Sequence, residues 1–305
     1  MLRGVLALVL VTVGVSAVQA QTATGDRLGV VATFSILRDW VRNVGGDRVE
    51  VTALVGPGAD AHVYAPSPAD AKIVAAARLI VVNGLGFEGW MDRLIQASAT
   101  RAAVVTASAG VTPRPAGTSG TSGAAAGGID PHADPHAWQS VRNAAIYVSN
   151  IRDALVRADP PGRATYEANA AAYLQELDRL DQEVRRVVAT IPPARRKVIT
   201  THDAFGYFAA EYGIAFFAQQ GVSTETEASA RDVARIIRLV REHDIPALFL
   251  ENVNDPRLLR RVAAETGAHI GGTLFSDSLT DATGAAPTYI DMMRHNIGEI
   301  AAALK

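Results

Sequence analysis

Short runs of apolar, often β-branched residues alternate along the chain with longer segments of helical periodicity. In the first half, strands are predicted over residues 28–35, 48–55, 79–84 and 102–108. Helices are predicted between them, as over 36–45 and 67–77. This alternation is typical of a parallel β-sheet flanked by helices.

The second half repeats the alternation. Strands are predicted over residues 197–202, 214–221, 246–252 and 269–277. Helices are predicted over residues 204–212, 229–243, 256–266 and 288–304. No residue-level repeat relates the halves, but both patterns indicate the same architecture. We therefore expect an α/β fold with two Rossmann-like lobes, each a parallel sheet flanked by helices.

A long helical segment, residues 160–193, lies between the halves. Prolines bracket it, and its interior is rich in Ala, Leu, Glu, Gln and Arg. Its apolar side chains recur every three or four positions, at Tyr166, Ala170, Tyr173, Leu177, Leu180, Val184 and Val187. That spacing predicts one helix of roughly 25–30 residues with a single buried face. We expect it to join the lobes; the alternative is a helix internal to one lobe.

These patterns divide the chain into a signal peptide and three structural parts. We expect a signal peptide at 1–20, an N-terminal lobe at 21–159, the linking helix at 160–193 and a C-terminal lobe at 194–305. Within the first lobe, residues 112–130 are mostly Gly, Ser, Thr, Ala and Pro. Such a segment buries too little apolar surface to become ordered, so a flexible loop is predicted.

The N-terminus has the features of an export signal. Arg3 precedes an apolar run from Val5 to Val18, and small residues lead to a cleavage position before Gln21. A membrane anchor is the alternative, but the run is shorter than the roughly 20 residues that a spanning helix needs. The chain has no cysteine, and hence no thiolate ligand and no residue for a lipid anchor. We expect a free periplasmic protein.

Charge and length narrow the function further. The net charge is −2 and no basic block occurs, which argues against nucleic acid or an anionic membrane as a partner. About 285 residues follow the signal peptide. A single hydrophobic core seldom supports a chain of this length, which again favours two lobes. We expect a monomer.

Four residues that can bind a metal follow predicted strands. His62 and His136 lie after strands of the first half, and His202 and Asp277 end strands of the second. In doubly wound α/β proteins, ligands bind beyond the carboxyl ends of the strands. Three imidazoles and a carboxylate complete a tetrahedral zinc shell, whereas a carboxylate that binds through both oxygens suits manganese. The alternative is that each is a solvated loop residue, a satisfied core residue or a cap.

The sequence also resembles a known family. The stretches that carry the resemblance are HVYAPSPAD, NGLGFEGW, DPHAW, THDAFGYFAAEYGI, STETEASARD, FLEN and TLFSDSL. They are similar to signature stretches of the zinc/manganese-type solute-binding proteins of bacterial ABC importers (ZnuA/TroA-like, cluster A-I), over nearly the whole mature chain. The resemblance implies two lobes joined by one long helix, with the metal held between them. Its ligand positions fall on His62, His136, His202 and Asp277.

The resemblance also bears on which metal is bound. Family members differ at the third ligand position, where Glu often accompanies manganese and His is found in zinc binders. His202 therefore favours the zinc-binding branch, with one Zn²⁺ per chain and Mn²⁺ as the alternative.

The tandem stretch DPHADPHAW contains a second histidine, His132, in the predicted flexible loop. Many zinc-binding members have a loop rich in His and acidic residues here, whereas this loop is mostly small residues. We hypothesise that His132, with Asp130 and Asp134 beside it, helps to capture zinc; the alternative is a neighbour with no metal role. Glu225 and Glu251 are candidates to orient an imidazole by accepting its second N–H. Surface or capping roles are their alternative.

The predicted function is capture and delivery of a metal ion, not catalysis. The protein is expected to pass zinc to a permease and an ATPase of an ABC importer, with a periplasmic metallochaperone as a further candidate partner. The main rival is an exported metallohydrolase, but no His-Glu-x-x-His motif or paired-metal cluster occurs. A surface adhesin is the third interpretation. Because imidazole binds metal when neutral, affinity should weaken as pH falls through roughly 6.5.

Overall fold

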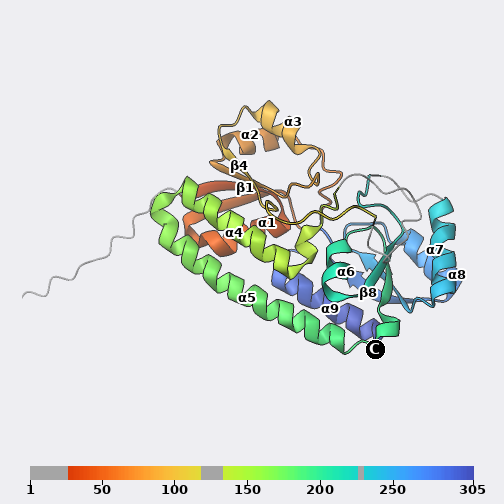
Figure 1. The fold of residues 1–305 in the computed structure, drawn as a ribbon. Coiled ribbons are helices and arrows are strands. Elements are labelled where there is room, and N and C mark those ends of the chain that lie inside the picture. Colours follow the sequence, from red (N-terminus) through yellow and green to blue (C-terminus); the bar gives the residue numbers. More distant parts are fainter. Residues whose placement is uncertain (1–26, 118–132, 226–229) are drawn as a thin grey trace, which may run out of the picture.

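The structure is a computed structural model, and it describes residues 27–117, 133–225 and 230–305. The predicted signal peptide, His132 and most of the predicted flexible loop lie outside the described residues. Two four-stranded parallel sheets, each flanked by helices, form the two halves of the molecule (Figure 1). The predicted fold class is thereby confirmed.

The first sheet has the strand order β2-β1-β3-β4. Its strands are β1 (Leu28–Phe34), β2 (Val49–Val55), β3 (Leu79–Val82) and β4 (Ala103–Thr106). The helices of this lobe are α1 (Ser35–Gly45), α2 (Pro68–Ala76), α3 (Met91–Ser98) and α4 (Val141–Ala158). The central strand β1 is buried along almost its whole length, which explains its continuous apolar run.

The second sheet has the equivalent order β6-β5-β7-β8. Its strands are β5 (Lys197–Thr200), β6 (Ala215–Ala218), β7 (Ala247–Glu251) and β8 (His269–Leu274). The helices that follow them are α6 (Gly206–Tyr212), α7 (Ala230–His243), α8 (Arg257–Thr266) and α9 (Tyr289–Leu304). In both sheets the chain starts at an inner strand, moves to one edge and then crosses to the other side.

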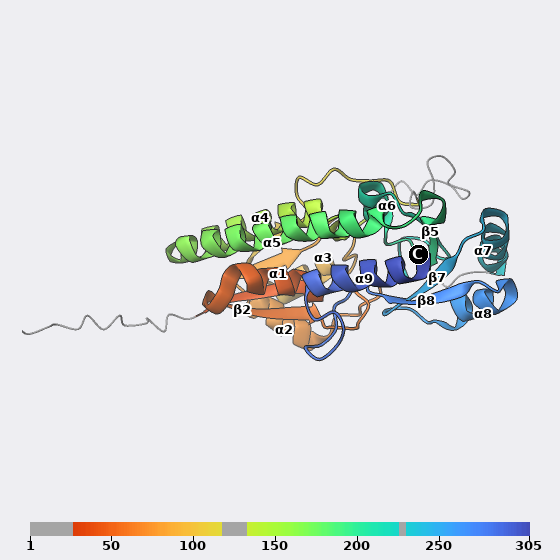
Figure 2. The ribbon, with the colours of Figure 1, turned by 90° about the horizontal axis from the view of Figure 1, so that it is seen from below.

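One long helix, α5 (Arg163–Ala189), spans much of the length of the molecule (Figures 1 and 2). Its apolar face packs against α1 and α4 of the first lobe and α9 of the second. Six of the seven residues that the periodicity predicted on that face are buried; Val187 is only partly so. The domain boundaries drawn around this helix remain a proposal.

The hydrophobic core is continuous across both lobes. Phe34 and Trp138 of the first lobe belong to the same buried cluster as Leu274 and Met292 of the second. A smaller cluster, which includes Ile236 and Leu248, lies under α7 and α8. The lobes are therefore joined by packed side chains as well as by a single connecting helix.

Candidate metal centre

All four predicted ligands lie beyond the carboxyl ends of strands, at the junction of the lobes. His62 lies in the loop between β2 and α2, and His136 immediately precedes the short 3-10 turn η2 (Ala137–Gln139). His202 follows β5 and Asp277 follows β8. Since both sheets are parallel, each presents its carboxyl ends at one edge, and the two edges face each other here.

The ligand atoms converge on one point. The Nε2 atoms of His62 and His136 are 3.1 Å apart. Asp277 Oδ2 lies 3.0 Å from Nε2 of His202 and 3.4 Å from Nε2 of His62, and Oδ1 lies 3.6 Å from Nε2 of His136. One ligand atom from each of the four residues lies within 4.8 Å of all the others. Atoms bound at about 2.1 Å to a tetrahedral ion are about 3.4 Å apart, so this spacing fits a single metal ion.

Burial and unmet hydrogen bonding also fit a cation. His136, His202 and Asp277 are fully buried, and His62 is 9% exposed. Both carboxylate oxygens of Asp277 are buried, and among the described residues they lie beside imidazole nitrogens without a hydrogen bond of regular geometry. Burying a carboxylate is costly, and a bound cation offsets that cost. The donor set is suited to zinc or manganese.

Two of the imidazoles are oriented by buried carboxylates. Asp134 Oδ1 lies 2.8 Å from Nδ1 of His136 and also accepts the backbone N–H of that residue. Glu251 Oε2 lies 2.5 Å from Nδ1 of His202, and its Oε1 accepts the backbone N–H groups of Thr201 and His202. Both contacts leave Nε2 of the ring facing the site.

Of the two glutamates predicted to orient an imidazole, only one lies beside a ring of the site. Glu251 contacts His202 as expected. Glu225 is exposed, and among the described residues its carboxylate has no contact with a ligand. Asp134, which the sequence suggested only as part of a capture loop, instead contacts His136. The signal that points to it is the Asp-Pro-His spacing, which places a carboxylate two residues before an imidazole.

An aromatic wall shields the centre from solvent on the side of the first lobe. The rings of Phe87 and His62 pack in a T-shaped arrangement with centroids 4.6 Å apart, and the ring centroids of Trp138 and His136 are 5.2 Å apart. Trp138 Nε1 and Gln139 Nε2 both donate to the backbone carbonyl of Ser276 in the second lobe. These bonds tie the segment of His136 to the residue that precedes Asp277.

The charges of the site depend on one another. Burial opposes ionisation of Asp277, but the imidazoles of His202 and His136 outweigh it and hold the pKa of this carboxyl well below its ordinary value. Burial disfavours the imidazolium of His202, yet the carboxylates of Glu251 and Asp277 outweigh burial and raise its pKa well above 6.5. Burial lowers the pKa of His62. Without a metal, the flanking carboxylates thus favour the protonated form of His202.

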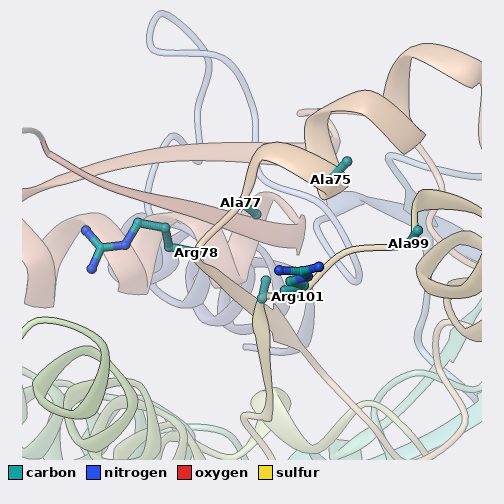
Figure 3. A pocket seen from close by; sticks show the side chains of 6 residues that line it. Ala75, Ala77, Arg78, Ala99 and Arg101 are labelled. Atoms are coloured by element: carbon teal, nitrogen blue, oxygen red, sulfur yellow. The ribbon is translucent and has the colours of Figure 1, made fainter.

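A cavity elsewhere in the first lobe has different properties. Its volume is about 510 Å³, and alanines together with Arg78 and Arg101 line it. Arg78 directly precedes β3 and Arg101 lies two residues before β4, so the cavity lies at the amino ends of the strands, opposite the histidines. Figure 3 shows the Arg78 side chain extending away from Arg101. The two charges do not converge on a ligand.

Comparison with known proteins agrees with this geometry. The family described as zinc-uptake complex component A, periplasmic, matches residues 30–303. The chain belongs to this family. The iron-binding protein YfeA of Yersinia pestis is 36% identical to it over 279 residues, which cover 91% of this chain and 86% of that protein. The manganese-binding lipoprotein MntA of Halalkalibacterium halodurans is 34% identical, covering 98% and 96%. The solved structure of the periplasmic zinc-binding protein TroA of Treponema pallidum superposes with a TM-score of 0.82 at 32% identity, covering 91% of this chain and 99% of that one.

Family membership establishes the general function. The manganese ABC transporter substrate-binding lipoprotein PsaA of Streptococcus pneumoniae is 31% identical, covering 92% of this chain and 90% of that protein. The protein is a periplasmic, metal-binding solute-binding component of an ABC importer, which works with a permease and an ATPase. Members of this family are solute-binding proteins, so the prediction that the chain is not an enzyme is confirmed and the metallohydrolase is excluded. Among the helices that the structure describes, none combines the length and the hydropathy of a membrane-spanning segment. The lipoprotein name of the relative from H. halodurans conflicts with our expectation of an unanchored protein.

Proposed function

We propose that this family member captures Zn²⁺ at His62, His136, His202 and Asp277, one ion per chain, and delivers it to the importer. The observation that carries the proposal is the convergence of three imidazole Nε2 atoms and one buried carboxylate at tetrahedral spacing. An imidazole-rich, closed set of four ligands is a donor set that zinc prefers.

Manganese is the second candidate. Both oxygens of Asp277 face the imidazole Nε2 atoms of the site, Oδ2 near His202 and Oδ1 near His136, so this carboxylate can bind an ion through both atoms. Such binding suits a hard ion that takes more than four ligands. The H. halodurans relative is named for manganese and the Yersinia pestis relative for iron. The two candidates therefore differ in how Asp277 binds.

The test measures metal content and competitive affinity of residues 21–305. We expect one zinc per chain, bound more tightly than manganese, and loss or severe weakening of binding in His202→Ala. The matched control is His269→Ala, which removes an exposed histidine at the start of β8. Preference for manganese would overturn the choice of metal while retaining the class of protein. Absence of stoichiometric metal in the wild-type protein would refute the proposed site.

His132 lies outside the described residues, and its role in capture remains a proposal. In His132→Ala we expect one ion per chain as in the wild-type protein, with slower association. Unchanged association kinetics would leave His132 as a neighbour without a metal role.

A further inference from the structure

His62 is held in place differently from the other two imidazoles. Nδ1 of His136 and of His202 each contacts a buried carboxylate. Nδ1 of His62 forms no such bond within the described part of the chain. Its position depends instead on the backbone, because its N–H donates to Oδ1 of Asp60 at 2.8 Å. Asp60 thus sets the conformation of the loop that presents this ligand.

The second oxygen of the same carboxylate reaches the other lobe. Oγ1 of Thr224, in the segment after β6, donates to Oδ2 of Asp60 at 2.6 Å. That length is typical of a hydrogen bond from a hydroxyl to an ionised acceptor, which is stronger than a neutral one. One carboxylate therefore bridges the ligand loop of the first lobe and the segment 221–225 of the second.

The segment that contains Thr224 is itself attached beside another ligand. The backbone carbonyl of Gly221 accepts the N–H of Asp203 at 3.1 Å, and Asp203 directly follows His202. A short chain of contacts thus runs from His202 through residues 221–224 and Asp60 to His62. Each lobe contributes one metal ligand to its ends.

The base of the His62 loop has a separate attachment. The N–H of Gly58 donates to the carbonyl of Leu279 at 3.0 Å and lies 2.8 Å from Oγ of Ser278. These contacts fix the start of the loop against the second lobe whether or not Thr224 is bonded. Loss of the Thr224 hydroxyl should therefore loosen the tip around His62 without releasing the loop.

We propose that Asp60 and Thr224 form an inter-lobe clasp that keeps His62 in the ligand set and so slows dissociation of the metal. This inference rests on the proposed metal site. Thr224 is a positioning residue, because its hydroxyl acts on the ion only through Asp60 and His62. His62 is also the most exposed of the four ligands, so its departure opens the site to solvent.

The test compares zinc dissociation into excess chelator, measured by stopped flow, for wild-type protein, Thr224→Val and Thr224→Ser. Valine keeps the shape of threonine but removes the hydroxyl. We expect about tenfold faster dissociation, because the loss of one hydrogen bond to a charged group has an effect of this size. Association should change less, and serine should restore the slow rate. The control is Ser223→Ala, since the Ser223 hydroxyl bonds locally to the N–H of Glu225.

The outcomes separate this inference from the proposed function. Equal dissociation rates for wild-type protein and Thr224→Val, at one zinc per chain, would refute the clasp and leave the metal site intact. If dissociation were faster in Thr224→Val and equally fast in Thr224→Ser, the clasp would also be refuted. The effect would then come from packing and not from the hydroxyl. If wild-type protein bound no metal, the proposed function itself would fail. Equal thermal unfolding of the metal-free variants checks that each is folded.

Discussion

At the scale of single residues, the chemistry of the site centres on His202. Its ring lies between two carboxylates, Glu251 at Nδ1 and Asp277 at Nε2, and all three side chains are fully buried. Glu251 also accepts two backbone N–H groups, so its position is fixed before any metal arrives. This preorganisation directs Nε2 of the imidazole toward the ion.

Replacement of Glu251 by glutamine tests that preorganisation. The amide keeps a similar shape but removes the negative charge beside Nδ1. The imidazole therefore becomes a weaker metal ligand. We expect metal affinity to fall roughly 10- to 100-fold, the usual cost of losing such a partner, with one ion still bound per chain. Competition titration measures it, and Glu265→Gln is the control because Glu265 pairs with Arg261 on the surface. Equal affinities for the two variants would contradict this role of Glu251.

The raised pKa of His202 predicts proton release on metal binding. In the metal-free protein this pKa lies well above 6.5, so at neutral pH the ion must displace a proton from the ring. Protonation of His202 stabilises the folded, metal-free protein. This stabilisation is fully present below pH 6.5 and is lost as the pH rises through the raised pKa. Metal affinity should therefore continue to rise with pH above 6.5, beyond the point that an unperturbed imidazole predicts.

Calorimetry in buffers of different ionisation enthalpy measures this release. We expect proton release at pH 7 that includes the proton of His202, whose pKa is raised, whereas burial lowers the pKa of His62. A binding enthalpy that does not depend on the buffer would contradict the prediction.

At the scale of elements, short loops present the ligands and longer helices hold those loops in register. The loop that carries His62 ends at a capping box, in which the Ser67 side chain accepts the N–H of Asp70 and the Asp70 carboxylate accepts the N–H of Ser67. Tyr64 also donates to Asp70 at 2.9 Å. The start of α2 thus fixes the far end of the ligand loop.

The helix α5 stabilises the whole arrangement through its buried face. Leu177 is 1% exposed, on the face that packs against α1, α4 and α9. Leu177→Ala should lower the free energy of unfolding by about 2–5 kcal/mol, because it removes buried apolar atoms and leaves a cavity. Denaturant unfolding of the metal-free protein measures this loss, and exposed Gln175→Ala serves as the control. A loss below about 1 kcal/mol would indicate that this face is not part of the core.

At the scale of the whole molecule, the continuous core limits how the lobes can move. The same buried cluster contains residues from both lobes, and α5 packs against helices of each. A wide rotation would expose much of this apolar surface, which is costly. Metal release should therefore proceed through local movement of the loops around His62 and His136, not through wide opening of the lobes.

Small-angle X-ray scattering of metal-free and metal-loaded protein tests this prediction. We expect the same radius of gyration within error, and crystal structures of the two forms should differ mainly in the ligand loops. A large rigid-body rotation between the two forms would contradict it.

The amount that could be predicted from sequence differs between these scales. Eight apolar runs predicted eight strands, and the three-and-four spacing from Tyr166 to Val187 predicted α5. Both predictions succeed because periodicity reflects which side of an element is buried. The predicted helices do not include α3 or α4. The four candidate ligands can be selected from sequence because parallel strands place their carboxyl ends together, a rule that needs no coordinates.

The amino-acid sequence alone indicates the class of fold, the kind of ligand that imidazole and carboxylate side chains bind, and the placement at strand ends of His62, His136, His202 and Asp277. Which carboxylate contacts which ring depends on the packing of the folded chain, since Asp134 and not Glu225 lies beside an imidazole of the site. The same packing decides the raised pKa of His202 and the bond between Asp60 and Thr224, which are 164 residues apart. Local patterns encode which face of an element is buried, whereas such contacts depend on how two separately formed sheets pack against each other.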